Sequence, residues 1–120
     1  TNFKKAVEGT NRNKLLLAGL WTEVCVALPA LSAMEDGYEV YVVADACAGS
    51  SCEAHNMALK RMIQAGVKPV TWQAALLEMQ RDWANKDTYQ AVTSIIKEYG
   101  GAYGLGLEYA QAMVPAAQQN

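Results

Sequence analysis

Short apolar runs along the chain are separated by segments in which apolar residues recur at helical spacing. Three runs predict β-strands, at residues 15–20 (LLLAGL), 38–44 (YEVYVVA) and 67–72 (VKPVTW). Short stretches rich in apolar and β-branched residues fit a buried strand. The first run has no polar position, which is typical of a parallel strand buried on both faces.

The intervening segments predict four helices, at about residues 22–36, 52–65, 73–83 and 88–99. Thr22 is the predicted N-cap of the first helix, and Ser50 or Ser51 the predicted cap of the second. The segment from Gly100 to the end holds four glycines and predicts only one or two helical turns, within residues 107–114.

Alternating strands and helices predict an α/β domain with a parallel sheet and helices on both faces. Ligands in such sheets bind where the carboxyl ends of strands lead into helices. The candidate junctions are Gly19–Cys25, Asp45–Ser51 and Thr71–Gln73. Asp45, at the end of its strand, is expected to stabilise a loop.

Composition and charge narrow the class of protein. The chain of 120 residues is 52% apolar and 18% charged, which indicates one folded domain rather than a disordered segment. Its net charge of −2 argues against a nucleic-acid partner, which normally needs a basic face. The longest apolar runs, Leu15–Trp21 and Val24–Met34, fall short of the roughly 18 residues of a membrane span, so we predict no membrane partner. The polar N-terminus shows no secretory signal.

The cysteines indicate free thiols in a cytoplasmic protein. Cys25, Cys47 and Cys52 are an odd number, whereas a disulfide-stapled secreted scaffold carries an even one. Their spacing is not that of a zinc site, and His55 is the single histidine. We therefore predict no metal and no cofactor.

Cys25 is the candidate reactive group. If Thr22 caps the helix, Cys25 lies in the first turn, where unpaired N–H groups and the helix dipole stabilise a thiolate. The same N–H groups could stabilise an oxyanion. Pro29 lacks the N–H that would bond the Cys25 carbonyl, so the helix should bend or be locally repaired there. The alternative, from the residues alone, is a buried and inert cysteine.

Several separate segments carry a family resemblance. They are AGLWTEVCVALPALSA (18–33), YEVYVVADA (38–46), VTWQAALLEMQRDW (70–83) and EYGGAYGLGLEYA (98–110). With them the chain resembles the isochorismatase-like cysteine hydrolase superfamily, and within it the YcaC-type hydrolases. The resemblance implies a three-layer α/β/α, Rossmann-like fold and a homo-oligomer, specifically an octamer.

The resemblance also implies a site around Cys25. Cys25 matches the family's nucleophile, which attacks an amide-like or related bond of a small-molecule substrate. A non-proline cis peptide would fall at Leu20–Trp21, and the backbone N–H groups of Trp21 and Cys25 would form the oxyanion hole. The Trp21 side chain would line the pocket.

The family's catalytic Asp and Lys lie upstream of the region that Thr1 begins to match. Residues 1–120 are therefore expected to be the C-terminal portion of a single such domain, without its N-terminal strands. The strand at 15–20 would then have an unpaired edge. No catalytic role passes to Asp45 or to the lysines at positions 4, 5 and 14.

Two other functions stay open beside the hydrolase. In a redox protein, Cys25 would pair with Cys47 or Cys52; in a non-catalytic assembly protein, the fold would be kept without the chemistry. His55 is expected to pack or lie at the surface, with proton transfer as its alternative. Trp72 and Trp83 are expected in the core or at a subunit contact. The glycines at 100, 101, 104 and 106 suit a subunit-contact arm and lack the context of a phosphate loop.

Overall fold

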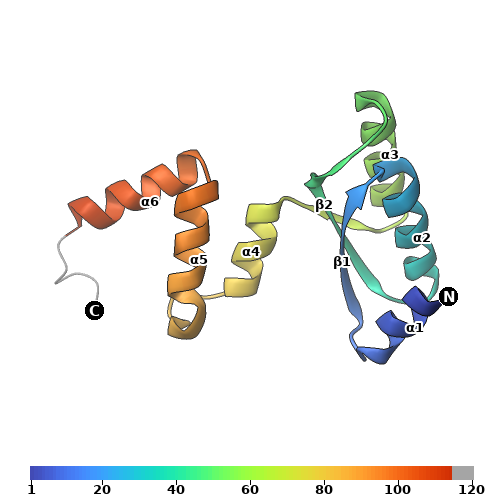
Figure 1. Cartoon of the computed structure of the whole chain (residues 1–120), viewed down its shortest axis with the longest axis horizontal. Coiled ribbons are helices and arrows are strands. Elements are labelled where there is room, and N and C mark those ends of the chain that lie inside the picture. Colours follow the sequence, from blue (N-terminus) through green and yellow to red (C-terminus); the bar gives the residue numbers. More distant parts are fainter. Residues whose placement is uncertain (115–120) are drawn as a thin grey trace. The chain divides into compact units, whose positions relative to one another are not determined.

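The structure is a computed structural model, and it describes residues 1–114. The chain divides into two compact units, Thr1–Trp72 and the part from Gln73 onward. Figure 1 shows the elements of both units in the order of the chain.

The first unit is built on a parallel sheet. Its strands are β1 (Lys14–Leu20), β2 (Glu39–Ala48) and β3 (Lys68–Val70), in the order β1-β2-β3. Both strand pairs are parallel. The helices of the unit are α1 (Asn2–Gly9), the short π-helix η1 (Thr22–Val26), α2 (Ala27–Glu35) and α3 (Cys52–Gln64). The predicted α/β fold with a parallel sheet is confirmed.

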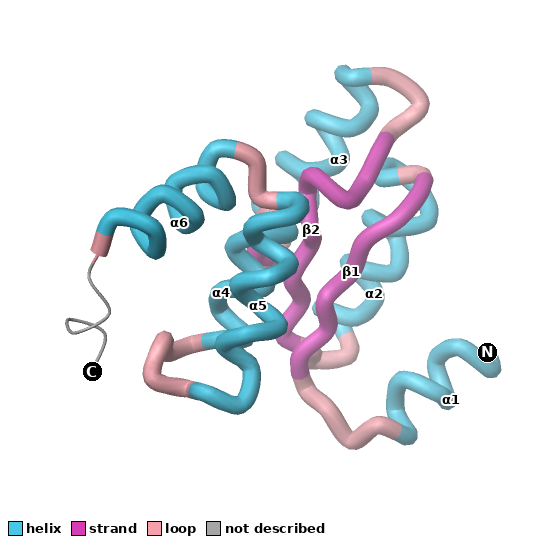
Figure 2. The backbone as a smooth tube through the Cα atoms, turned by 60° about the vertical axis from the view of Figure 1, so that its left-hand side comes forward, coloured by secondary structure: helices cyan, strands magenta, loops and turns pink. Residues whose placement is uncertain are grey.

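The core of this unit lies between the sheet and the helices α2 and α3, which lie on the same side of β1 and β2 in Figure 2. Alternation along β2 points Val40 and Val42 toward these helices, where both are fully buried. They pack with Ala30 of α2 and Met62 of α3. This packing holds α2 and α3 against the sheet, and so positions the loops that connect the carboxyl ends of β1 and β2 to these helices.

The prediction that the first strand is buried on both faces is wrong. Exposure alternates along β1, and Leu16 and Leu20 are 45% and 59% exposed. Among the described residues β1 pairs only with β2, so it is an edge strand. A sequence run cannot report what covers each face of a strand or which strands pair with it. The unpaired N–H and C=O groups of an edge strand call for a covering partner.

A bulge separates the two halves of the β1–β2 pairing. Leu17 pairs with Val42, but Gly19 pairs with Cys47, so β2 carries extra residues around Asp45. Gly19 has φ +139, a backbone conformation that residues with a side chain rarely adopt. The bulge extends β2 to Ala48, beyond the predicted end at residue 44.

The second unit contains α5 (Lys86–Tyr99), α6 (Ala102–Met113) and most of α4 (Trp72–Gln80). The sequence predicted only one or two turns where α6 lies. Gly104 is buried, and a Cβ on it would collide with the carbonyl oxygen of Ile96 in α5. Gly104 therefore allows close packing of α5 and α6, which outweighs its low helix propensity. The sequence also missed α1.

Candidate active site

Cys25 lies just beyond the carboxyl end of β1, at the first of the predicted junctions. The peptide bond Leu20–Trp21 is cis, as expected. The chain then enters η1, in which Cys25 is the fourth residue, and its side chain is exposed. The alternative of a buried cysteine is wrong. Trp21 is 50% exposed beside it.

The helix that holds Cys25 is wider than an α-helix. The carbonyl of Trp21 accepts from the N–H groups of Val24, at 3.1 Å, and Val26, at 3.3 Å. The Ala27 N–H donates to the carbonyl of Thr22, five residues back, which is π-helical geometry. Pro29 then falls in the first turn of α2, where its missing N–H costs nothing. The local repair predicted from Pro29 is therefore a π-helix.

Thr22 does not cap the helix, so this prediction is wrong. Trp21 holds the N-cap position of η1, without a side-chain hydrogen bond, and Thr22 is the first helical residue. The Thr22 side chain is fully buried, and its Oγ1 shares a hydrogen bond of 2.8 Å with Nδ1 of His55. Because Thr22 lies inside the helix, its side chain is not placed to accept from the first N–H groups.

Glu23 joins η1 to the turn between β2 and α3. Its Oε1 accepts from the backbone N–H of Ser50 at 3.0 Å. The pKa of the Glu23 carboxyl is lowered, first by the Ser50 side chain, then by the backbone N–H groups of Glu23 and Ser50, and last by the nearby His55. A Cβ on Gly49 would lie 2.8 Å from the backbone nitrogen of His55 and 2.9 Å from Glu23 Oε2. Glycine at position 49 therefore lets this turn lie against the carboxylate.

The other two junctions are structural. Ser51 caps α3 by accepting from the Ala54 N–H, as one of the two predicted serines should. Asp45 accepts from the backbone N–H of Trp72 at 2.8 Å, so it fixes the start of α4. The expected loop-stabilising role of Asp45 thus takes the form of a bond to the third junction, made possible by the bulge in β2.

The remaining cysteines lie near the same end of the sheet. Cys47 is half-buried against the core beside Gly19, and Cys52 is exposed at the start of α3. Both are free thiols, as is Cys25. His55, which was expected to pack or lie at the surface, is half-buried in the first turn of α3. The prediction missed its hydrogen bond to Thr22.

No metal-binding group is found near Cys25. Within residues 1–114, no three histidine, cysteine, aspartate or glutamate side chains lie close enough together to hold a metal ion. None of the helices in this range combines the length and apolarity needed to cross a membrane.

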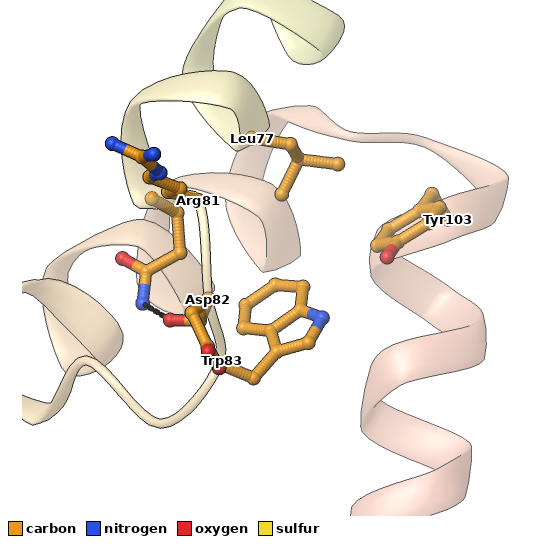
Figure 3. A pocket seen from close by; sticks show the side chains of 6 residues that line it. Leu77, Arg81, Asp82, Trp83 and Tyr103 are labelled. Carbon is orange, nitrogen blue, oxygen red and sulfur yellow. Dashed lines mark hydrogen bonds between the residues drawn. The ribbon is translucent and has the colours of Figure 1, made fainter.

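A cavity of about 270 Å³ lies in the second unit (Figure 3), lined by Leu77, Gln80, Arg81, Asp82, Trp83 and Tyr103. Gln80 is buried, and its side-chain amide donates to the carbonyls of Asp82 and Asn85. Trp83 is 42% exposed and meets Tyr89 edge to face. The lining of this cavity contains no cysteine.

Comparison with known proteins decides the family. The isochorismatase domain model matches residues 1–74, which include all of the first unit. The chain belongs to the isochorismatase family. It is 45% identical over 84 residues to the probable hydrolase YcaC of Escherichia coli, a match that covers 70% of this chain and 40% of that protein.

Two solved structures of YcaC resemble this one. The Escherichia coli protein, described as an octameric hydrolase of unknown specificity, gives a TM-score of 0.83 at 36% identity, over 93% of this chain and 54% of that one. YcaC from Pseudomonas aeruginosa, solved with hexane-2,5-diol and covalent acrylamide, gives 0.81 at 36% identity, over 89% and 52%. The chain thus spans about half of each relative.

Proposed function

We propose that the protein is a cysteine hydrolase of the isochorismatase family and that Cys25 is its nucleophile. The observation that carries the proposal is the position of Cys25: exposed, at the carboxyl end of β1, and four residues after the cis peptide Leu20–Trp21 that the family resemblance led us to expect. Ligand sites of parallel α/β sheets lie at this end of the strands.

The proposed reaction is hydrolysis of an amide-like bond in a small molecule. The Cys25 thiolate adds to the carbonyl carbon, and the backbone N–H groups of Trp21 and Cys25 stabilise the resulting oxyanion. The carbon–nitrogen bond then breaks, the amine leaves with a proton, and water hydrolyses the thioester to release the acid and regenerate the thiol. The Asp and Lys that the resemblance implies, expected upstream of this segment, would transfer the protons. The Trp21 side chain would line the pocket.

Covalent acrylamide in the Pseudomonas aeruginosa relative also supports this proposal. Acrylamide is an electrophile: a thiolate adds to its terminal carbon, and the neighbouring carbon takes a proton from water. Thiolates rather than thiols perform such additions. A cysteine that reacts with acrylamide must be accessible to it and must form a thiolate. Cys25 is exposed, so it meets the condition of access.

Cys52 provides an internal control, because it too is exposed and free. We expect acrylamide to modify Cys25 about tenfold faster than Cys52 at neutral pH, as measured by peptide mass spectrometry at timed quenches. In the complete protein, Cys25→Ala should abolish turnover of a panel of small amides while the circular dichroism spectrum is retained. Equal rates at the two cysteines, together with full turnover by Cys25→Ala, would refute the proposal. Oxidation followed by mapping of a Cys25–Cys47 or Cys25–Cys52 disulfide would favour the redox alternative instead.

We also propose a cytoplasmic homo-oligomer, an octamer like that described for Escherichia coli YcaC. In the second unit, α6 exposes Leu105, Tyr109 and Met113, which are spaced four residues apart and so share one face of the helix. An exposed apolar face of this kind is typical of a subunit contact. Light scattering on the complete protein measures the number of subunits.

A further inference from the structure

The helix that carries Cys25 is a single short stretch of π-helix that runs directly into α2, where the Ala27 N–H bonds the carbonyls of Thr22 and Val24. It has five residues, and the Trp21 carbonyl serves two of its N–H groups. Short helices gain little from their own hydrogen bonds and depend on tertiary contacts. The orientation of the Cys25 sulfur is therefore set by whatever fixes η1 to its surroundings.

Thr22 is the buried anchor of this helix. It lies three residues before Cys25, within the same short helix, and its side chain is fully buried. A buried hydroxyl without a partner is costly, because it has lost its hydrogen bonds to water and gained none. The partner here is Nδ1 of His55, 2.8 Å away, on a different element and 33 residues along the chain.

His55 is itself held firmly. It lies in the first turn of α3, and its backbone N–H donates to the Ser51 carbonyl at 3.0 Å. The Ser51 side chain caps the same turn. A second bond, from the Ser50 N–H to Glu23, joins η1 to the residues just before this turn. The start of α3, which is fixed to the core through Ala58 and Met62, thus reaches η1 at two adjacent residues.

We propose that Thr22 and His55 are positioning residues for Cys25, acting through their shared hydrogen bond to fix the turn of η1 that presents the sulfur. The inference rests on the proposed function, because it takes Cys25 as the reacting group. It assigns a role to two residues that the proposed reaction does not use. Small displacements of a reacting group can change rates by orders of magnitude, so an anchor three residues away can govern reactivity.

The test uses paired variants that either remove or keep the hydrogen-bonding group. Thr22→Val replaces the hydroxyl by a methyl of similar size, and Thr22→Ser keeps the hydroxyl. His55→Leu removes the ring nitrogen, and His55→Asn places an amide nitrogen near the position of Nδ1. We expect Thr22→Val and His55→Leu each to slow acrylamide addition at Cys25 by about tenfold. Thr22→Ser and His55→Asn should recover most of the rate.

The double variant Thr22→Val/His55→Leu should be no slower than either single variant, because the two residues act through one bond. Independent, multiplying losses would contradict a shared role. A rate at Cys25 within twofold of the parent in both Thr22→Val and His55→Leu, in proteins with parental circular dichroism spectra, would overturn the proposal.

Amide hydrogen exchange separates this proposal from the proposed function. Loss of the anchor should speed exchange in residues 22–26 whether or not Cys25 is a nucleophile, and the exchange of α5 in the second unit should stay unchanged. If the parent Cys25 reacts no faster than Cys52, the proposed function fails, and exchange in residues 22–26 still decides whether the pair holds η1. Unchanged exchange in both Thr22→Val and His55→Leu would refute the positioning role independently.

Discussion

Two glutamates lie at opposite ends of the same sheet and have different partners: Glu39 pairs with lysines, and Glu23 accepts from a backbone N–H group. Glu39, at the amino end of β2, bonds the Lys68 ammonium of β3 and the Tyr41 hydroxyl, and lies 3.6 Å from the Lys14 ammonium of β1. The Lys68 and Tyr41 hydrogen bonds are the main reason why the pKa of the Glu39 carboxyl falls to about 2. Glu23, near the carboxyl end of β1, is bound instead by the turn at Ser50.

The two ends of the sheet are held by different interactions, and Cys25 lies at the end without recorded ion pairs among residues 1–114. Among residues 1–114, the recorded ion pairs join Lys4 to Asp36 and Glu39 to Lys14 and Lys68; none involves residues 19–26 or 44–55. The amino end is thus joined by charge across three strands. The carboxyl end is joined by hydrogen bonds through Thr22, Glu23 and Asp45, without a lysine or arginine paired beside Cys25.

The largest effect is expected where the carboxyl end is most tightly packed. Gly49→Val would push a side chain against the His55 backbone and Glu23 Oε2. We expect it to lower the free energy of unfolding by about 1–3 kcal/mol, the usual cost of overpacking. It should also slow acrylamide addition at Cys25. Urea unfolding and timed alkylation measure the two effects.

Gly9→Ala is the matched control, because a Cβ there meets nothing within 4 Å. Its free energy of unfolding should stay within about 0.5 kcal/mol of the parent or rise slightly. If Gly49→Val were as stable and as reactive as Gly9→Ala, the close contact between the turn and η1 would have no consequence.

A smaller effect is expected at the amino end, and it depends on pH. The folded pKa of Glu39 lies below its ordinary value of 4.5, so its contribution to stability is present above pH 4.5. It is lost as the pH falls toward 2. Between these values the parent should lose more stability than Glu39→Gln, which has no carboxyl to protonate. Urea unfolding at a series of pH values gives the comparison.

Glu108→Gln controls for the general effect of removing a negative charge, because Glu108 lies exposed on α6. It should keep the parental pH dependence. Acid profiles of the parent and Glu39→Gln that run parallel between pH 4.5 and 2 would show that the cluster at the strand starts contributes nothing through this carboxylate. The Cys25 alkylation rate should be unaffected by Glu39→Gln, because the two residues lie at opposite ends of the strands.

The smallest expected effect is a difference in salt dependence between a variant at the amino end of the sheet, Glu39→Gln, and one at the carboxyl end, Glu23→Gln. At 1 M ionic strength the Debye length is about 3 Å, so exposed ion pairs are strongly screened. The destabilisation caused by Glu39→Gln should therefore shrink on going from low to high salt. That caused by Glu23→Gln should persist, because Glu23 accepts from the backbone N–H of Ser50 and pairs with no lysine or arginine among residues 1–114. Equal salt dependence of the two variants in urea unfolding would remove the distinction between the ends.

Much of the site followed from residues that are adjacent in the chain. Trp21, Thr22 and Cys25 lie together because they are successive residues at the end of one strand, and the cis peptide at Leu20–Trp21 followed from the family resemblance. Pro29 indicated that the helix would be irregular. The prediction that Thr22 caps the helix was wrong. Its hydroxyl bonds His55, which is 33 residues away in the chain. Nothing in a local pattern reports such a distance.

The sequence alone determined the three strands of the parallel sheet, the two helices between them and the place of Cys25, because hydrophobic periodicity and the residues at strand ends are local properties. Tertiary structure decided the rest. Leu16 and Leu20 share the exposed face of β1, because alternate side chains of a strand point to opposite faces of the sheet. Asp45, beside the bulge in β2, bonds the start of α4. Packing against Ile96 turned a glycine-rich segment into α6. The partner of a buried polar group is chosen by which elements meet, and that depends on the whole fold.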